Sequence, residues 1–157
     1  MRRLPKLSLA VDSGSHLILA AIASTGGGGD QPFFEPLLYH GWRRSDAVKC
    51  VVADAGYDSD ENLRLAEQDM NLKAIVPAKA GRPTDKPATS LRRRAMQERF
   101  AAGKHKPLYG QRWQCETVNS MIKRNLGSAL RARSAVRRRH EMLLRVLTHN
   151  IMILAQG

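Results

Sequence analysis

The stretch VKCVVAD, residues 48–54, decides how this chain is expected to fold. It is a nearly continuous apolar run, rich in valine, which is typical of a strand buried on both faces within a sheet. The run ends in the carboxylate of Asp54, and open α/β sheets place their sites at the carboxyl ends of such strands. Ala55 and Gly56 follow, and their small size lets a ligand approach closely. Asp54 is therefore a candidate site residue, although a strand-end aspartate that caps a turn is the simpler alternative.

Two further strands are expected before this stretch and one after it. Residues 6–12 alternate polar and apolar side chains, and residues 17–24 provide a partner beyond the turn SGSH, so together they predict a β-hairpin. Residues 73–78, KAIVPA, predict another short strand. With helices between them, the order indicates an α/β fold in which a hairpin leads into a mixed sheet.

Helices are expected in the remaining segments. Asp30 is positioned to cap a helix that Pro36 keeps short or broken. Asp58 has a glutamate three residues later, the spacing of a capping box that opens the next helix. Two helices, at about 109–126 and about 139–155, close the chain.

Charge divides the chain into two unlike parts. The 157 residues carry a net charge of +12. Residues 79–139 hold 17 Lys and Arg against three acidic residues, whereas residues 1–78 hold eight basic and ten acidic residues. This asymmetry predicts a surface that binds a polyanion, with nucleic acid as the leading candidate. Within the basic half, residues 79–107 are expected to form a mobile or partly helical insertion in one partial domain, residues 1–157.

Cysteine usage and hydropathy indicate the cellular compartment of the protein. Cys50 and Cys115 belong to no metal or disulfide motif and are expected to be reduced core thiols of a cytosolic protein. No apolar run reaches the ~20 residues of a membrane-spanning helix, and no signal peptide is evident. A cytoplasmic, nucleoid-associated protein without a membrane partner is therefore expected.

The segment YGQRWQCETVNSMIKRN, residues 109–125, places polar groups along one line of a helix. At about 100° per residue, four polar side chains fall within a sector of about 60°: Tyr109, Arg112, Glu116 and Lys123. Apolar side chains lie on the opposite face: Cys115, Val118, Ile122 and Leu126. The pattern predicts a helix that packs one face on the core and presents a narrow polar stripe from the other.

A charged stripe is most often a solvated face, and Arg112 with Glu116 has the spacing of an ordinary surface ion pair. A functional role is favoured because Glu116 is a single carboxylate among cations. Such a carboxylate is useful when it binds a divalent metal while neighbouring Arg and Lys bind phosphate. The runs LRRRAMQERF and RARSAVRRRH are likewise interpreted as phosphate contacts. Trp113 borders the stripe and is interpreted as packing at its rim, with stacking on a base as the alternative.

Three segments resemble bacterial insertion-sequence transposases of the DDE class. The hairpin KLSLAVDSGSHLILAAIAS, with its glycine loop, resembles the strands that follow the family's first strand. VVADAGYDSDENLRLAEQ and LKAIVPAK are similar to the segment around the second catalytic aspartate. Residues 109–123 match the family's Y-R-E-K signature at every spacing. The resemblance implies an RNase H-like fold, a mixed sheet flanked by helices. It also implies DNA transposition by metal-dependent phosphoryl transfer, which cleaves and joins strands at transposon ends.

The resemblance also implies roles for individual residues. Asp54 and Glu116 would be the catalytic residues and would bind two Mg²⁺ ions, for which Mn²⁺ can substitute. Tyr109, Arg112 and Lys123 would bind DNA, mainly through its phosphates. The implied partners are transposon ends and target DNA, with a homo-oligomer as the active form.

The chain departs from the family at the first strand. The family places the first of three catalytic carboxylates there, but residues 6–12 align better with the second strand, which leaves Asp12 as a hairpin-turn residue. We therefore expect a truncated or split enzyme that lacks the first strand, is completed by an upstream-encoded N-terminal portion and has little activity alone. Two alternatives stay open. One is a non-catalytic basic nucleic-acid-binding protein, and the other is a stand-alone RNase H-like nuclease in which Asp12 is a ligand.

Overall fold

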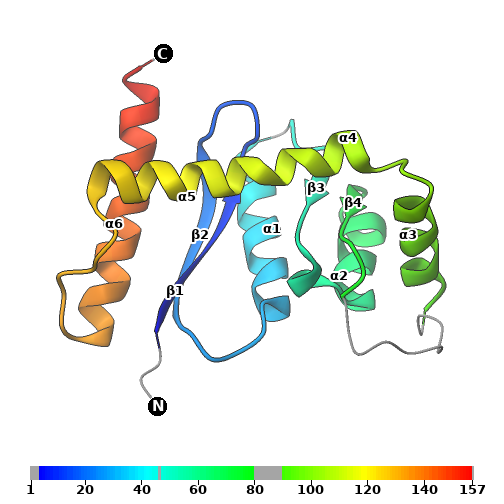
Figure 1. Ribbon diagram of the computed structural model, residues 1–157, viewed down its shortest axis with the longest axis horizontal. Helices are drawn as coiled ribbons and strands as arrows, with labels where there is room; N and C mark the ends of the chain where they lie inside the picture. The colour runs from blue at the N-terminus through cyan, green and yellow to red at the C-terminus, as the bar shows by residue number, and fades with distance from the viewer. Residues whose placement is uncertain (1–3, 46, 80–89, 157) are drawn as a thin grey trace.

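The computed structural model describes residues 4–45, 47–79 and 90–156 and has a mixed α/β fold (Figure 1). Its strands form two pairs. β1 (Pro5–Val11) and β2 (Ile18–Thr25) are antiparallel, whereas β3 (Cys50–Val52) and β4 (Lys73–Ile75) are parallel. Within the described residues no ladder of hydrogen bonds joins the two pairs. The predicted mixed sheet is thus present as two separate, two-stranded sheets.

The helices surround these strand pairs. In chain order they are α1 (Phe34–Trp42), α2 (Asp60–Arg64), α3 (Leu91–Ala101), α4 (Lys106–Tyr109), α5 (Trp113–Leu126) and α6 (Ala135–Leu154). Single turns of 3₁₀- or π-helix lie at Gln31–Phe33, Ala55–Tyr57, Leu65–Asp69 and Gly110–Arg112. The helix expected over 109–126 is therefore divided among α4, a 3₁₀ turn and α5. Of the described helices, none is long and apolar enough to cross a membrane.

Helix α1 lies between the two strand pairs and packs on both (Figure 1). Phe34 belongs to the same apolar cluster as Ala74 of β4. Gly41 faces Ala10 of β1, which lies 3.7 Å from the position that a Cβ on this glycine would take. Pro36 falls in the first turn of α1, where its missing N–H costs no hydrogen bond. The prediction of a short helix here is confirmed.

The buried apolar side chains form two clusters rather than one. The larger lies around α1 and β4: Phe34, Leu38, Leu63, Ala66, Leu72, Ala74, Val76 and Met96. The smaller joins β2 to α5: Ile18, Val118 and Ile122. The prediction that Val118 and Ile122 face the core is confirmed, since they are 0% and 6% exposed.

Polar contacts fix α6 on the hairpin. The side-chain amide of Asn150 accepts the backbone N–H of Ile18 and donates to its carbonyl, both at 2.9 Å. His149 is buried, and its Nε2 lies 3.0 Å from the carbonyl oxygen of His16. Ile18 is therefore held by a side chain in the way that a neighbouring strand would hold it, and His149 is a buried side chain with a hydrogen-bond partner on the hairpin.

Asp58 does not have the role that its position predicted. Ser59 caps α2, because its hydroxyl accepts the N–H of Asn62 at 3.0 Å. Asp58 is only 4% exposed, and its carboxylate accepts two hydrogen bonds from Arg93 of α3, at 3.0 and 2.6 Å. It also accepts the N–H of Lys79 at 2.9 Å. The capping prediction was wrong because a carboxylate buried this deeply needs a cationic partner, which the basic segment supplies.

The predicted insertion at about 79–107 contains the helix α3, and its residues 80–89 lie outside the described part of the chain. The Asp58 pair and a longer pair between Arg92 and Asp60, at 3.9 Å, connect α3 to the start of α2. Part of the run LRRRAMQERF therefore stabilises the fold. This corrects the interpretation of the whole run as phosphate contacts.

Removing the buried carboxylate should destabilise the protein strongly. Asp58→Ala is expected to lower the free energy of unfolding by roughly 3 kcal/mol, because the guanidinium of Arg93 and the N–H of Lys79 then lose a buried carboxylate that accepts three hydrogen bonds. Asp60→Ala is the matched control and should cost less than about 0.5 kcal/mol, since its pair is long and exposed. Urea unfolding measures both, and equal losses would contradict the assignment of Asp58 as the anchor of α3.

His105 is a buried polar side chain without a hydrogen-bond partner among the described residues. Its ring packs edge-on against Phe100, with 5.3 Å between the ring centroids. Burial lowers the pKa of His105 below its ordinary value, and the nearby cations Lys73 and Arg99 lower it further. The folded state therefore favours the neutral form of the His105 ring.

Stability should consequently depend on pH through His105. The unfolded chain takes up this proton more readily, so the free energy of unfolding is expected to fall as the pH falls below about 6.5. His105→Leu should reduce the slope between about pH 7.5 and pH 5.5, whereas replacement of the exposed His40 by Leu should not. Urea midpoints across this range measure the slope. An unchanged slope in His105→Leu would exclude this histidine as its source.

Candidate functional site

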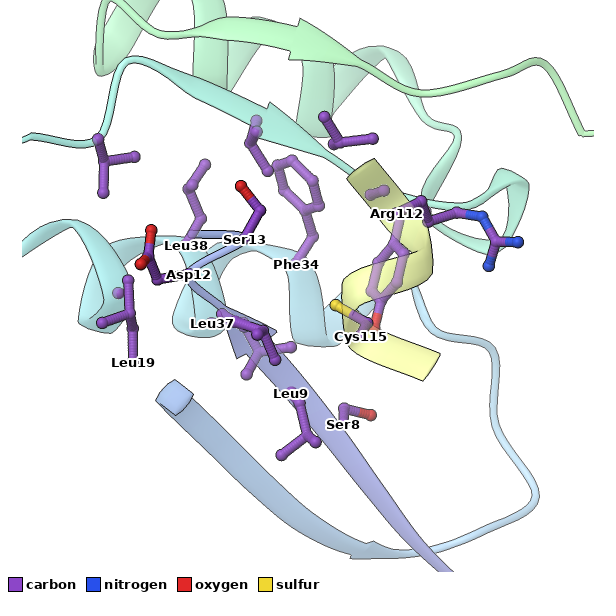
Figure 2. Close-up of a pocket in the computed structure, with 18 of the residues that line it drawn as sticks. Ser8, Leu9, Asp12, Ser13, Leu19, Phe34, Leu37, Leu38, Arg112 and Cys115 are labelled. Carbon is purple, nitrogen blue, oxygen red and sulfur yellow. The ribbon is translucent and has the colours of Figure 1, made fainter. Parts of the chain in front are cut away.

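A cavity of about 710 Å³ lies between β1 and β3 (Figure 2). Three apolar side chains of α1 line one side of it: Phe34, Leu37 and Leu38. The beginning of α5 contributes Cys115, and the preceding 3₁₀ turn contributes Arg112, at one end. We call this cavity the central groove.

Both predicted catalytic carboxylates line the central groove. Asp54 follows β3, and its Oδ1 accepts the N–H of Gly56 at 2.8 Å, so it also caps the turn, as the simpler alternative foresaw. Glu116, on α5, forms an ion pair with Arg112 at 2.7 Å. Burial disfavours the charge of Arg112, but hydrogen bonding to Glu116 and the fields of Glu116 and Asp54 outweigh it and raise its pKa. Two carboxylates distant in sequence therefore act on the same guanidinium.

Asp12 is held in the turn between β1 and β2. Its carboxylate accepts the hydroxyl and the N–H of Ser15, at 2.5 and 2.8 Å, and these hydrogen bonds lower the pKa of Asp12. Figure 2 shows Asp12 at the end of the groove opposite Arg112. The expectation that Asp12 is a hairpin-turn residue is confirmed.

The other signature residues continue the line of Glu116. Arg112 ends the 3₁₀ turn that follows Tyr109, and in such a turn side chains three residues apart eclipse each other. The guanidinium of Arg112 accordingly lies 6.0 Å from the ring centroid of Tyr109. Tyr109 packs edge-on against Phe100 at 5.1 Å. Lys123, further along α5, lines a second groove that also includes Glu116. Arg112 and Glu116 thus line the central groove and Glu116 and Lys123 line the second groove, whereas Tyr109 lines neither and packs on Phe100.

Comparison with protein families decides the classification. The family described as transposase DDE domain matches residues 2–151, which is nearly the whole chain. The chain belongs to the DDE transposase family. Its membership connects it with DNA binding, transposition and recombination. Searches of curated proteins and of solved structures found no match.

DDE transposases generally use divalent metals, and the donor set of this chain can be compared with that need. Carboxylate oxygens are the ligands that Mg²⁺ prefers, so Asp54 and Glu116 are suitable in kind. They are too few, because no group of three or more His, Cys, Asp or Glu side chains in the described ranges could hold a metal ion. Arg112 also competes for Glu116. The two carboxylates alone therefore suit weak metal binding.

The second groove of the transposase domain is basic. It lies between the start of β1, α5 and α6, and its cations are Lys6, Lys123, Arg138 and Arg145. Arg138 and Arg145 donate to backbone carbonyls of the loop before α6. Lys6 forms an ion pair with Asp30. Lys123 is exposed and has no ion-pair partner among the residues described.

The prediction that the Asp30 side chain caps a helix was wrong. Asp30 precedes the 3₁₀ turn Gln31–Phe33, but its carboxylate pairs with Lys6 and makes no capping hydrogen bond there.

Three side chains near the start of α5 and on β3 lie in other surroundings than the sequence predicted. Trp113 is 65% exposed, so the interpretation as rim packing was wrong. Cys50 and Cys115 are free, but they line the groove instead of the core interior. Burial raises the pKa of both thiols, which are protonated at neutral pH. No local pattern signals that residues 50 and 115 line the same groove, since this depends on how α5 packs beside the strands.

Proposed function

We propose that this DDE transposase domain cleaves and joins DNA strands at transposon ends by metal-dependent phosphoryl transfer. Asp54 and Glu116 are the catalytic carboxylates in this proposal. The observation that carries it is the meeting of these two residues, distant in sequence, around Arg112 in the central groove. The basic second half of the chain, which opposes the charge of DNA, gives further support.

We assign Mg²⁺ to the two carboxylates, in a two-metal arrangement in which Mn²⁺ can substitute. A bound divalent metal supplies activation of the attacking water or 3′-hydroxyl and stabilisation of the leaving oxygen. The chain's own groups orient the ligands, since Gly56 holds Asp54 through its N–H and Arg112 holds Glu116. Because affinity for a hard cation depends on the number of charged ligands, two carboxylates bind it weakly. Little activity is therefore expected from residues 1–157 alone.

The proposal includes an N-terminal portion, encoded upstream, that provides the first strand of an RNase H-like sheet and the third carboxylate. Asp12 is a poor substitute, because Ser15 already occupies its carboxylate. In this view residues 1–157 are one partial domain of a Y-R-E-K transposase from a bacterial insertion sequence, with its insertion at about 79–107. The complete enzyme acts on nucleoid DNA as a homo-oligomer.

DNA is proposed to lie along the stripe from the central groove to the second groove. Tyr109, Arg112 and Lys123 contact its phosphates, and the exposed Trp113 is available for stacking on a base. Arg112 shares its charge with Glu116, whereas Lys123 offers its whole charge to phosphate.

Replacing either carboxylate should abolish metal-dependent nicking without weakening DNA binding. Asp54→Asn and Glu116→Gln are expected to slow nicking of supercoiled plasmid by at least about 100-fold, the scale of losing a catalytic group. The assay uses Mn²⁺ and the chain both alone and with the upstream-encoded portion. Because the chain alone should be weak, Mn²⁺ binding is followed in parallel by electron paramagnetic resonance, and both variants should bind less.

Two control variants separate this proposal from its alternatives. Glu98→Gln changes an exposed carboxylate on the basic helix α3 and should leave nicking unchanged. Asp12→Asn should also leave it unchanged, and a loss of nicking there would favour the stand-alone nuclease. Nicking and Mn²⁺ binding that survive in both Asp54→Asn and Glu116→Gln would overturn the assignment of these carboxylates. An absence of nicking by the parent chain, both alone and with the upstream-encoded portion, would favour a non-catalytic DNA-binding protein.

The salt dependence of DNA binding tests the proposed phosphate contacts. Lys123→Ala should lower the slope of log K against log salt by about 0.9, as expected for the loss of one phosphate contact, and should do so for any DNA sequence. Lys73→Ala, at an exposed position of β4 in the near-neutral half and outside both grooves, should leave the slope unchanged. Fluorescence anisotropy at several salt concentrations measures the slope. Equal slopes for Lys123→Ala and the parent chain would contradict the contact.

A further inference from the structure

Helix α6 carries apolar side chains that are exposed to solvent. Among the described residues, half of the strongly exposed large apolar side chains lie on this one helix. Five of them follow one another towards its C-terminal end and are between 42% and 66% exposed: Leu143, Leu144, Leu147, Ile151 and Leu154. We call these five side chains the outer stripe.

The outer stripe lies opposite the buried face of α6. Met142 and His149 are buried against the rest of the protein, and Asn150 is bonded to Ile18 of β2. At about 100° per residue, the stripe occupies a sector of about 100° on the side of the helix away from His149. Figure 1 shows α6 at one end of the molecule. Contiguous exposed apolar patches are small on most monomeric proteins, so this stripe marks an interaction surface.

The spacing within the outer stripe indicates that its partner is a helix. Leu144, Leu147, Ile151 and Leu154 are separated by three, four and three residues. This alternation repeats apolar side chains every 3.5 residues on average, which is the pattern of the seam between two helices of a coiled coil. The outer stripe therefore has the form of one half of such a seam.

The charges beside the outer stripe favour a second copy of the chain over a different helix. Residues that flank a coiled-coil seam commonly select the partner through ion pairs between the helices. Residues 146–155 contain no Asp, Glu, Lys or Arg. The nearest charges, Glu141 and Arg145, pair with each other at 2.7 Å and bond to the loop before α6. The stripe thus offers no charge for selecting another helix, whereas two identical apolar stripes match each other by symmetry.

An antiparallel arrangement suits the side chains of α6 better than a parallel one. With a two-fold axis level with residue 149, Leu144 faces Leu154 of the second copy, and Leu147 faces Ile151 of the second copy. All four seam residues then meet apolar partners. In a parallel pair, residue 137 would continue the seam one heptad before Leu144, and two Arg137 side chains would face each other. Like charges in such a position are unfavourable.

We propose that two copies of this chain pair through the outer stripes of their α6 helices, antiparallel about a two-fold axis. In this arrangement Arg137 and Arg139 lie beyond the last turn of α6 of the second copy. The C-terminal end of a helix is the negative end of its dipole, which favours cations nearby. The basic beginnings of the two helices point away from each other and are available to DNA.

This pairing deepens the proposed function, because it assigns a surface to the homo-oligomer that the proposed function includes. It requires only α6, however, and neither metal, DNA nor an upstream-encoded portion takes part. A monomeric chain would leave the assignment of Asp54 and Glu116 untouched, and a failure of the nicking assay would leave the pairing untouched.

Sedimentation equilibrium of residues 1–157 tests the pairing without DNA or metal. Because the seam is short and belongs to the weak class of interfaces, the measurement covers about 5 to 500 µM protein, and a monomer–dimer equilibrium is expected within it. Leu147→Glu should weaken dimerisation by at least about 30-fold, since it buries a charge without a partner in each half of the seam. Its urea midpoint should stay near that of the parent chain, because Leu147 is exposed in the monomer. Leu91→Glu, at an exposed position of α3, is the matched control and should leave the dimer unchanged.

Cross-linking tests the antiparallel direction. A mixture of the Leu144→Cys and Leu154→Cys chains should form a disulfide between residues 144 and 154 under mild oxidation, identified by peptide mass spectrometry. Leu144→Cys alone should not link residue 144 to itself, because the two copies of this residue lie about 15 Å apart along the helix axis, beyond the reach of a disulfide.

Three results would overturn the proposal. One is a chain that stays monomeric over the whole concentration range. Another is a dimer that Leu147→Glu leaves intact or that Leu91→Glu weakens equally, since its surface would then lie elsewhere. The third is a disulfide between two copies of residue 144 in place of the link from 144 to 154, which would show a parallel pair.

Discussion

Backbone pairing at the two facing strand edges is the constraint on which the rest of this structure depends. Strand N–H and C=O groups need partners, and among the described residues β1 and β3 are each paired on one side only. Helix α1 compensates by packing on both pairs, with Phe34 in the larger cluster and Gly41 against the hairpin. The core is correspondingly divided, and the cavity between its two parts is the candidate site. The same gap in the sheet therefore shapes both the packing and the chemistry.

The basic side chains of this transposase domain fall into two groups, buried ones that stabilise the fold and exposed ones that can bind an anion. Arg93 is committed to the buried carboxylate of Asp58, and this pair fixes a helix, α3, whose own apolar surface is small. A pair of this kind stabilises chiefly because breaking it would strand a buried charge. Exposed cations such as Lys123 make no comparable contact and are available to DNA. Counting every cation of a basic run as a phosphate contact therefore overestimates the number of such contacts.

Local patterns predicted the hairpin, the short strand at β3 and the buried face of α5, because each depends on neighbours along the chain. The approach of Asp54 and Glu116 was expected from a family signature, whereas periodicity alone left both as a turn cap and a surface ion pair. What sequence could not give depends on contacts between distant segments. Asp58 was assigned to a cap because its partner Arg93 lies on another helix, and the groove that Cys50 and Cys115 both line forms only when α5 packs beside the strands.

Completion of the sheet and completion of the site are coupled in this architecture. The free edge of β3 leads directly to Asp54, whose carboxylate is already oriented by Gly56, and α5 holds Glu116 beside the same end of the groove through Arg112. The first strand proposed to come from the upstream-encoded portion would, in a position parallel to β3, bury apolar side chains against α1 and α5 and end beside these carboxylates. The free energy of strand docking would then position the following residue without any further ordering of the chain. Under the proposed function, the weak metal binding expected of two carboxylates follows from the open sheet edge, since α5 already holds Glu116 in the central groove through Arg112.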